Sequence, residues 1–407
     1  MTEMQPTTTR RVLFAHDGPL EIGPDGVARG VHYTNSLIDR YLALGDSVSF
    51  LMRTRMVSAK RAEQYTPLSR PEFQYFGAPD IKGPVKIMVH SQTLKKSIKD
   101  HVSEHDVFVV RLPSAIGRRV YHQAIRQGKP VLVEFVACPW DAHWNHSFLG
   151  KLSAPYYFLK NRALLRQAAY VQYVTSEFLQ RRYPTNGLAT ACSNVQIQAA
   201  SLSVIKRRLK RISALTASSR LVLTTVAAVD VKYKDQATVL RAIAYLAQSG
   251  RRFHYRIIGQ GKPARLKRLT SELGLSSQVE FVGPVPHSQI TEWLDDSDLY
   301  IQPSRQEGLP RALIEAMCRG CLGFGSTAGG IPELLPSDHI FPKGGYLELA
   351  NLLSGVTPEQ MRRDARRNFK VAAQYDTDNL NQVRANFYKM FLTREFPDIK
   401  QVQHVTT

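Results

Sequence analysis

Two glutamates, Glu307 and Glu315, are separated by seven residues near the middle of the C-terminal half of the chain. Carboxylates accept hydrogen bonds from hydroxyl groups and stabilise positive charge at a reacting carbon. The sequence around them predicts a buried strand over Leu299–Gln302, a turn-rich loop over 303–309, and then a helix. Pro310 suits the first helical position, because its missing N–H would have no partner there. One carboxylate is therefore expected in a loop and the other inside a helix.

The start of this helix is a predicted anion site. Helix N-termini present unpaired N–H groups and the positive end of a dipole. A diphosphate held there would leave an attached ribose about one turn further along, within reach of Glu315, because side chains tilt toward the helix start. Glu307 would face whatever is attached to the far phosphate. The expected backbone contacts are the amides of Gly308, Leu309 and Arg311. The alternative is an ordinary strand-to-helix crossover with solvated glutamates.

The C-terminal half alternates strand and helix patterns, which predicts a parallel sheet. Strands are expected at residues 221–226, 253–258, 279–282 and 299–302. Ligands of such sheets bind at the carboxyl ends of the strands. Lys232 and Lys234 follow the first of these strands, and the turn formed by Gly259 and Gly261 follows the second. A surface lysine is often only solvated. Lys232 and Lys234 are candidate ligand contacts because they are expected beside the other candidate residues.

Residues 306–317, Gln-Glu-Gly-Leu-Pro-Arg-Ala-Leu-Ile-Glu-Ala-Met, precede a Gly-Gly-Ile-Pro-Glu motif at 329–333. This combination resembles the retaining nucleotide-sugar glycosyltransferases of GT-B architecture, specifically their large fourth family, whose hallmark Glu-x7-Glu is matched by Glu307 and Glu315. The resemblance extends well over residues 220–345 and more weakly over the N-terminal half. It implies two Rossmann-like parallel-sheet α/β domains facing across a cleft.

The resemblance also implies an activity and roles for these residues. A sugar would move from a UDP or GDP type of donor to a hydroxyl with retention of anomeric configuration, without a metal or cofactor. Glu315 would hold the ribose, Glu307 would orient the donor sugar, and Lys234 would neutralise the diphosphate. The family places an Arg beside that Lys, and this chain lacks it, so Lys232 is the expected substitute. Gly259 and Gly261 would lie beside the nucleotide.

The bacterial polysaccharide transferases share this motif most closely. The resemblance therefore implies a glycan or polyprenyl-diphosphate-linked acceptor in exopolysaccharide or envelope polysaccharide synthesis, which is an analogy from the fold family rather than a derivation. Other readings remain open. A sugar-nucleotide epimerase of the same fold would turn over without an acceptor. A non-catalytic binding or scaffold protein would bind nucleotide without cleavage, and the missing Arg favours it slightly.

The N-terminal half opens as a doubly wound sheet. Residues 12–15 predict a strand, 16–30 a glycine-rich loop, 37–44 a helix and 48–52 the next strand. Gly30, in that loop, either contacts phosphate on the acceptor side or only permits a tight turn, since no strict G-x-G-x-x-G is present. Further strands are expected at residues 106–111, 130–136, 169–175 and 193–197.

Asp141 and His143 lie between two tryptophans after one of these strands. Aromatic faces suit sugars, so the two residues are candidates for acceptor contact. A packed or lid loop is the alternative, and two histidines in this stretch are insufficient for a metal.

Four segments describe the expected domain organisation. They are an acceptor-side domain at 10–198, a linker at 199–218, a nucleotide-sugar domain at 219–373, and a helix at 374–395 that crosses back to the first domain. The positive run at 206–211 is expected to be solvated.

The chain has 407 residues, a hydrophobic content of 43% and a net charge of +20. The charge favours anionic partners. Nucleic acid is disfavoured, because zinc-finger spacing, an aromatic RNA signature and a basic heptad helix are all missing from the sequence. The basic residues between 53 and 99 form either a solvated face or a patch for anionic lipid or a diphosphate-linked acceptor.

The sequence also contains signals that relate to the location of the protein in the cell. The four cysteines do not suggest a disulfide framework, and Cys318 and Cys321 are predicted to be small buried residues. The first ten residues lack the apolar core of a signal peptide, and no apolar run approaches the ~20 residues of a membrane helix. A cytoplasmic location is expected, either free or peripheral on the inner face of the membrane.

Overall fold

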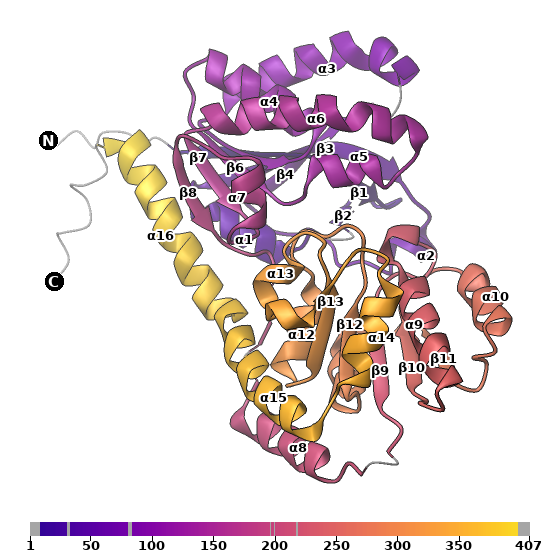
Figure 1. Cartoon of the computed structure of the whole chain (residues 1–407). Coiled ribbons are helices and arrows are strands. Elements are labelled where there is room, and N and C mark those ends of the chain that lie inside the picture. Colours follow the sequence, from indigo (N-terminus) through magenta and orange to yellow (C-terminus); the bar gives the residue numbers. More distant parts are fainter. Residues whose placement is uncertain are drawn as a thin grey trace, which may run out of the picture.

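The computed structural model describes residues 9–30, 33–79, 84–195, 197–198, 200–216 and 219–397. These residues form two α/β units, each built on one sheet with helices against both of its faces (Figure 1). None of the described helices combines the length and the apolar composition that a bilayer crossing requires.

The N-terminal sheet has the strand order β4-β3-β1-β5-β6-β7-β8, with all of these neighbours parallel and the short β2 antiparallel to β1. Its strands are β1 Arg11–Ile22, β2 Ala28–Gly30, β3 Ser47–Met56, β4 Phe73–Ala78, β5 Val107–Leu112, β6 Val131–Phe135, β7 Tyr170–Tyr173 and β8 Leu188–Ala191. The helices that cover it include α1 Asn35–Leu42, α3 Pro84–Glu104, α4 Ala115–Arg126 and α6 Phe148–Gln167. The polypeptide reverses its direction of strand addition at β1, which lies between β3 and β5.

Two strand predictions in this sheet are wrong. β1 continues to Ile22 through the segment predicted as loop, because Leu20 and Ile22 are buried and pair with β3 after a bulge between His16 and Pro19. The described residues of 193–197 do not form the predicted strand, and an isolated bridge joins Ile197 to Asp376. The edge strand is β8 instead, which is only four residues long and half exposed, so its hydrophobic signal is weak.

The C-terminal sheet is entirely parallel in its described strands, with the order β11-β10-β9-β12-β13-β14. The strands are β9 Val222–Val226, β10 His254–Ile258, β11 Val279–Gly283, β12 Leu299–Gln302, β13 Leu322–Ser326 and β14 Ile340–Phe341. The helices include α9 Gln236–Gln248, α10 Ala264–Glu272, α11 Ile290–Asp295, α12 Arg311–Cys318, α13 Ile331–Leu334, α14 Tyr346–Ser354 and α15 Pro358–Ala372. The strand order switches between β9 and β12, and ligand crevices form at such switch points.

The positive run at 206–211 is only partly solvated: Lys206, Arg207 and Lys210 are exposed as predicted, whereas Arg208 is not. It lies in α8 Leu202–Ser213, and Arg208 is almost fully buried there. Its guanidinium donates hydrogen bonds to the carbonyl oxygens of Leu294 at 2.7 Å and Arg319 at 2.9 Å, and also to that of Ser297. These carbonyls lie at or just after the C-terminal ends of α11 and α12, where backbone acceptors lack helical partners. One arginine therefore satisfies the ends of two helices.

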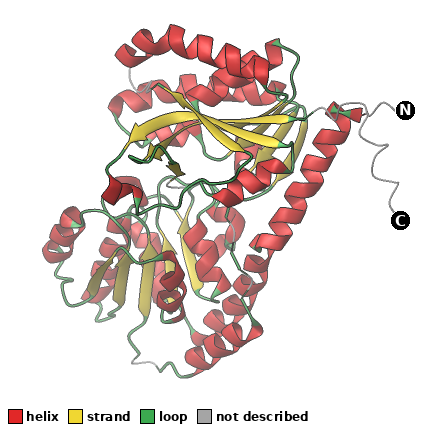
Figure 2. Ribbon diagram, turned by 180° about the vertical axis from the view of Figure 1, so that it is seen from behind, coloured by secondary structure: helices red, strands yellow, loops and turns green. Residues whose placement is uncertain are grey.

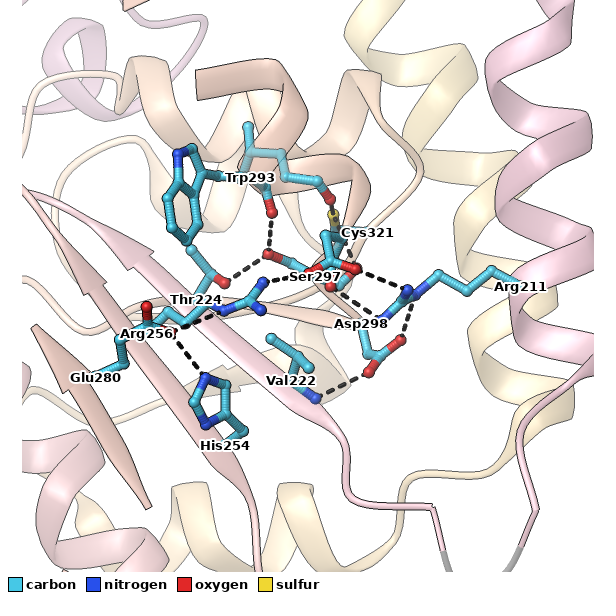
Figure 3. Close-up of polar contacts among 12 residues, drawn as sticks. Arg211, Val222, Thr224, His254, Arg256, Glu280, Trp293, Ser297, Asp298 and Cys321 are labelled. Atoms are coloured by element: carbon cyan, nitrogen blue, oxygen red, sulfur yellow. Dashed lines mark hydrogen bonds and ion pairs between the residues drawn. The ribbon is translucent and has the colours of Figure 1, made fainter. Parts of the chain in front are cut away.

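A second arginine of α8 fastens the helix to the sheet. Arg211 Nε donates to Asp298 Oδ1 at 2.9 Å, while Asp298 Oδ2 accepts the backbone N–H of Val222 at 2.8 Å (Figure 3). Asp298 and Val222 stand at the starts of the adjacent strands β12 and β9. The Cys318 and Cys321 side chains are buried nearby, as predicted.

The last helix, α16 Thr377–Glu395, runs beside both units (Figure 2). Its residues Phe387, Tyr388 and Phe391 belong to the core under the N-terminal sheet. The Phe391 ring lies edge-on to that of Tyr170 with centroids 4.9 Å apart, and Tyr170 Oη donates to Glu395 Oε1 at 2.6 Å. The C-terminal segment is thus packed against the N-terminal domain.

Candidate active site

The loop after β12 leads into α12, and Pro310 stands at the junction. Its backbone is extended, with φ −76° and ψ 112°, so it is the residue before the helix and the helix begins at Arg311. The prediction that Pro310 is the first helical residue is therefore off by one position. The site retains a helix N-terminus at the place where the sequence predicted an anion site.

Glu307 meets two side chains from the carboxyl ends of β9 and β12. Lys234 Nζ donates to Glu307 Oε1 at 2.6 Å, and Gln302 Nε2 donates to the same oxygen at 3.0 Å. Only 10% of the Glu307 side chain and 22% of the Lys234 side chain is exposed, so this ion pair is partly shielded from water. The structure therefore brings together the two residues that the sequence proposed for the reacting centre.

Glu315 lies about one turn along α12, by about 100° of rotation per residue, and it faces an open volume. With His287, Thr291 and Gln198 it lines a cavity of about 470 Å³. Its Oε1 lies 3.6 Å from His287 Nε2. Burial raises the pKa of Glu315, while His287 and Arg311 oppose that shift. The cavity gives a ligand access to a carboxylate on the helix that begins at the anion site.

Binding of a ribose by Glu315 is expected to depend on pH. A carboxylate accepts two hydroxyl hydrogen bonds only when ionised, and the raised pKa means that protonation starts at a higher pH than for an ordinary glutamate. Nucleotide affinity should therefore fall as pH decreases toward the pKa of Glu315. Titration calorimetry across pH would measure this, and Glu315→Gln should flatten the dependence and lower affinity about tenfold at neutral pH. An unchanged pH profile in Glu315→Gln would exclude Glu315 as its source.

The segment around Glu307 also contacts the other domain. A Cβ built on Gly308 would lie 2.7 Å from the carbonyl oxygen of Val136, just after β6, so a larger residue here would push the domains apart. Gly330 N donates to the Gly308 carbonyl at 2.7 Å, which ties the Gly-Gly-Ile-Pro-Glu loop to the same place. A Cβ on Gly329, where φ is +56°, would lie 2.2 Å from the Glu307 carbonyl. The candidate site therefore lies where the two domains meet.

Glu333 joins the two domains directly. Its carboxylate accepts the backbone N–H groups of Ser176 and Phe178 at 2.6 Å each, and that of Glu177 at 3.2 Å. These amides form the N-terminus of α7 Phe178–Arg182. A serine placed like Ser176 often caps a helix with its own hydroxyl group. Instead, a carboxylate from the other domain takes that role, and no local sequence signal marks it.

Two glycines shape the neighbouring loop. Gly259 and Gly261 have φ values of +155° and +111°. A Cβ at Gly259 would lie 2.0 Å from the Ala227 carbonyl oxygen, and one at Gly261 would lie 2.4 Å from Asp230 Oδ1. Both glycines therefore let the turn after β10 pack against the loop after β9, which also carries Lys234.

Lys232, the expected substitute for the missing diphosphate arginine, has an exposed side chain, and its contact with a diphosphate stays a prediction. Arg305, two residues before Glu307, was not identified from the sequence. Its Nε donates to Asp235 Oδ2 at 2.7 Å, and its backbone N–H donates to the Tyr233 carbonyl at 2.7 Å. Arg305 thus holds the Lys234 loop against the Glu307 loop.

The comparisons with known proteins now bear on this arrangement. Residues 208–351, which contain Lys234, Glu307 and Glu315, match the family of glycosyl transferases, group 1. This match confirms, for the matched part of the chain, the resemblance predicted from Glu307 and Glu315. Protein CapJ of Staphylococcus aureus is 24% identical over 376 residues, which are 91% of this chain and 93% of CapJ.

Two further proteins are similar. A putative colanic acid biosynthesis glycosyltransferase of Escherichia coli K12, WcaL, is 30% identical over 183 residues, which are 41% of this chain and 42% of WcaL. The crystal structure of Anabaena HepE in complex with UDP and glucose superimposes with a TM-score of 0.63 at 18% identity, over 93% of this chain and 99% of that one. This structural likeness confirms the predicted two-domain fold.

In the N-terminal domain, the structure places His143 and Asp141 in different surroundings. Both lie in α5 Pro139–Trp144, but Asp141 is buried and does not line the neighbouring cavity. His143 does line that cavity of about 750 Å³, beside Arg118 and Arg119. Its ring stacks on Tyr157 with centroids 3.9 Å apart, and burial lowers its pKa. The two arginines were not identified from the sequence, because they lie in α4, more than one element before the tryptophan-rich segment.

Gly30 contacts the protein rather than an open site. It is buried in β2 opposite Leu20, and a Cβ there would lie 2.5 Å from the Tyr33 carbonyl. This packing supports the tight-turn reading over a phosphate contact.

The basic residues between 53 and 99 divide into two groups. Arg61 pairs with the buried Glu21, and Arg70 pairs with Asp39 at 2.6 Å, so these arginines are already neutralised. Lysines on α3 are exposed, at positions 95, 96 and 99. Lys82 falls outside the described residues, as does the side chain of Lys86. Within the part that the structure describes, the exposed members of the predicted patch are therefore Arg55, Lys60 and the lysines of α3.

Proposed function

We propose that this glycosyltransferase moves a sugar from a nucleotide diphosphate donor, of the UDP or GDP type, to a hydroxyl acceptor with retention of anomeric configuration. One observation carries the proposal. The Lys234–Glu307 pair stands at the start of α12, and Glu315 of the same helix lines a cavity of about 470 Å³. The similar HepE structure, which contains UDP and glucose, favours UDP.

In the proposed complex, the diphosphate lies against the amides of Gly308, Leu309 and Arg311. Lys234 turns from Glu307 toward the phosphates, and Glu307 then accepts hydrogen bonds from the donor sugar. The bond from the anomeric carbon to the phosphate oxygen breaks, and the acceptor oxygen attacks from the same face. Its proton passes to the departing phosphate. Lys234 and the amides stabilise the negative charge that develops there, which is the largest electrostatic task in such a step.

The proposed acceptor site is the cavity of about 750 Å³ at the carboxyl ends of β5 and β6. Arg118 and Arg119 supply guanidinium groups, which bind phosphate oxygens in a fixed fork geometry. We therefore favour a glycan or polyprenyl-diphosphate-linked acceptor, in agreement with the exopolysaccharide names of the relatives. Such an acceptor would place the enzyme at the cytoplasmic face of the membrane. The proposed reaction uses no metal or other cofactor.

A donor panel tests this proposal. The chain is heated with UDP-, GDP- and ADP-sugars, and the donor that binds should stabilise the fold by about 2.7 kcal/mol at a concentration of about 100 Kd. Slow release of nucleoside diphosphate from that donor should follow. Stabilisation without release, even with acceptor present, would favour a scaffold protein. Conversion of the sugar without acceptor would favour an epimerase.

A further inference from the structure

Helix α6 exposes large apolar side chains on its outer face. Each is between 55% and 75% exposed: Phe148, Leu149, Leu152, Tyr156 and Leu159. At about 100° per residue, these five positions fall within an arc of about 100° around the helix. The buried residues of α6 lie on the opposite side, at Gly150, Ala154, Asn161, Leu164 and Leu165. The helix therefore has one apolar face packed on the domain and a second open to solvent. We call the five exposed residues the α6 ridge.

Positive charge surrounds the α6 ridge. Helix α6 contains no Asp or Glu in its 20 residues, whereas it contains Lys151, Lys160, Arg162 and Arg166. The neighbouring helix α4 also contains no acidic residue, and it contributes Arg118, Arg119 and Arg126. The two helices lie side by side in Figure 1 and share the walls of the 750 Å³ cavity.

We propose that the α6 ridge docks on a bilayer that contains anionic lipid. Apolar side chains on an amphipathic helix bury at the boundary of headgroups and acyl chains, and flanking lysines and arginines meet lipid phosphates. Contiguous exposed apolar patches are uncommon on soluble proteins and mark interaction sites. A second copy of the chain fits poorly, because a two-fold contact through the ridge would bring like charges together. The charge complementarity favours the lipid surface.

The ridge is continuous with the proposed acceptor site. Leu149 belongs to the ridge and also lines the 750 Å³ cavity with Arg118 and Arg119. An acceptor whose lipid stays in the bilayer would thus reach the arginines directly. This explanation of why docking occurs rests on the proposed function, whereas the docking itself rests on the exposed apolar and basic residues.

Vesicle flotation tests the docking. The full chain should float with vesicles of phosphatidylcholine and phosphatidylglycerol and much less with phosphatidylcholine alone. Leu152→Glu/Leu159→Glu should weaken anionic vesicle binding about tenfold or more, because both leucines lose their burial in lipid. The matched control is Leu202→Glu on α8, since Leu202 is 69% exposed but lies in the other domain. Lys151→Gln/Lys160→Gln should weaken only the preference for anionic lipid.

Three results would overturn the docking. They are an absence of vesicle binding by the natural chain, equal binding by the double leucine variant, and a dimer in sedimentation that the double variant abolishes. Thermal stabilisation by the donor is measured on the same samples. If the natural chain does not float with vesicles but is still stabilised by the nucleotide-sugar, the docking alone is refuted. If no nucleotide-sugar stabilises the natural chain, the proposed function is refuted.

Discussion

Replacing Glu307 with glutamine is expected to lower sugar transfer roughly a hundredfold, with little change in nucleotide affinity. The glutamine keeps the shape of the side chain but loses its charge, so it cannot stabilise positive charge at the anomeric carbon. It also releases Lys234, whose Nζ now lies 2.6 Å from the carboxylate. The lysine remains available to the diphosphate, which is why binding should persist. Steady-state transfer rates and titration calorimetry separate the two effects.

Glu272→Gln is the matched control for this variant. Glu272 is an exposed carboxylate in α10 that pairs only loosely with Arg268, at 3.7 Å. The Glu272→Gln variant should have the same transfer rate and nucleotide affinity as the natural chain. A Glu307→Gln enzyme that keeps its full rate would remove Glu307 from the reacting centre. A variant that loses nucleotide affinity instead would assign Glu307 to binding.

Replacing Arg208 with methionine is expected to lower the free energy of unfolding by about 3 kcal/mol, because hydrogen bonds from a charged group contribute about 1.5–3 kcal/mol each. The methionine conserves most of the buried volume, so the loss reports the hydrogen bonds to Leu294, Ser297 and Arg319. The Arg319 carbonyl lies at the C-terminal end of α12, the helix that begins at the proposed diphosphate site. The affinity for the nucleotide-sugar should therefore weaken as well. Denaturant unfolding measures the stability change.

Arg207→Met provides the comparison within the same helix. Arg207 is exposed, so its replacement should change stability by no more than about 0.5 kcal/mol. If Arg208→Met is as mild as Arg207→Met, α8 is the solvated segment that its charge pattern suggested. That result would contradict the buried hydrogen bonds that Arg208 makes in the structure.

The central part of the site could be predicted because its signals are local. The strand at Leu299–Gln302, the loop carrying Glu307 and the helix carrying Glu315 are consecutive, and alternating patterns define the sheet around them. Lys234 was identified as a site residue only through the resemblance. Its contact with Glu307 joins residues 73 positions apart, so no local pattern could reveal it. The end of β1 was missed, because its pairing with β3 depends on a bulge that no composition signal reveals.

The long-range contacts of charged side chains could not be predicted. Glu333 caps a helix that begins more than 150 residues earlier, and Arg208 bonds carbonyls 86 to 111 residues away. In both cases the side chain is charged, and charge in a sequence indicates solvent exposure until a distant acceptor is known. Asp141 is a further charged residue that its type predicts to be exposed, and it is buried in the structure. Long-range hydrogen bonding, rather than local preference, decided the positions of Glu333 and Arg208.

A crystal structure of the chain soaked with UDP tests the central claim most directly. We expect the diphosphate against the amides of Gly308, Leu309 and Arg311, Lys234 Nζ within hydrogen-bond distance of a phosphate oxygen, and both ribose hydroxyls on the Glu315 carboxylate. Nucleotide bound away from the start of α12, or ribose turned away from Glu315, would contradict the account.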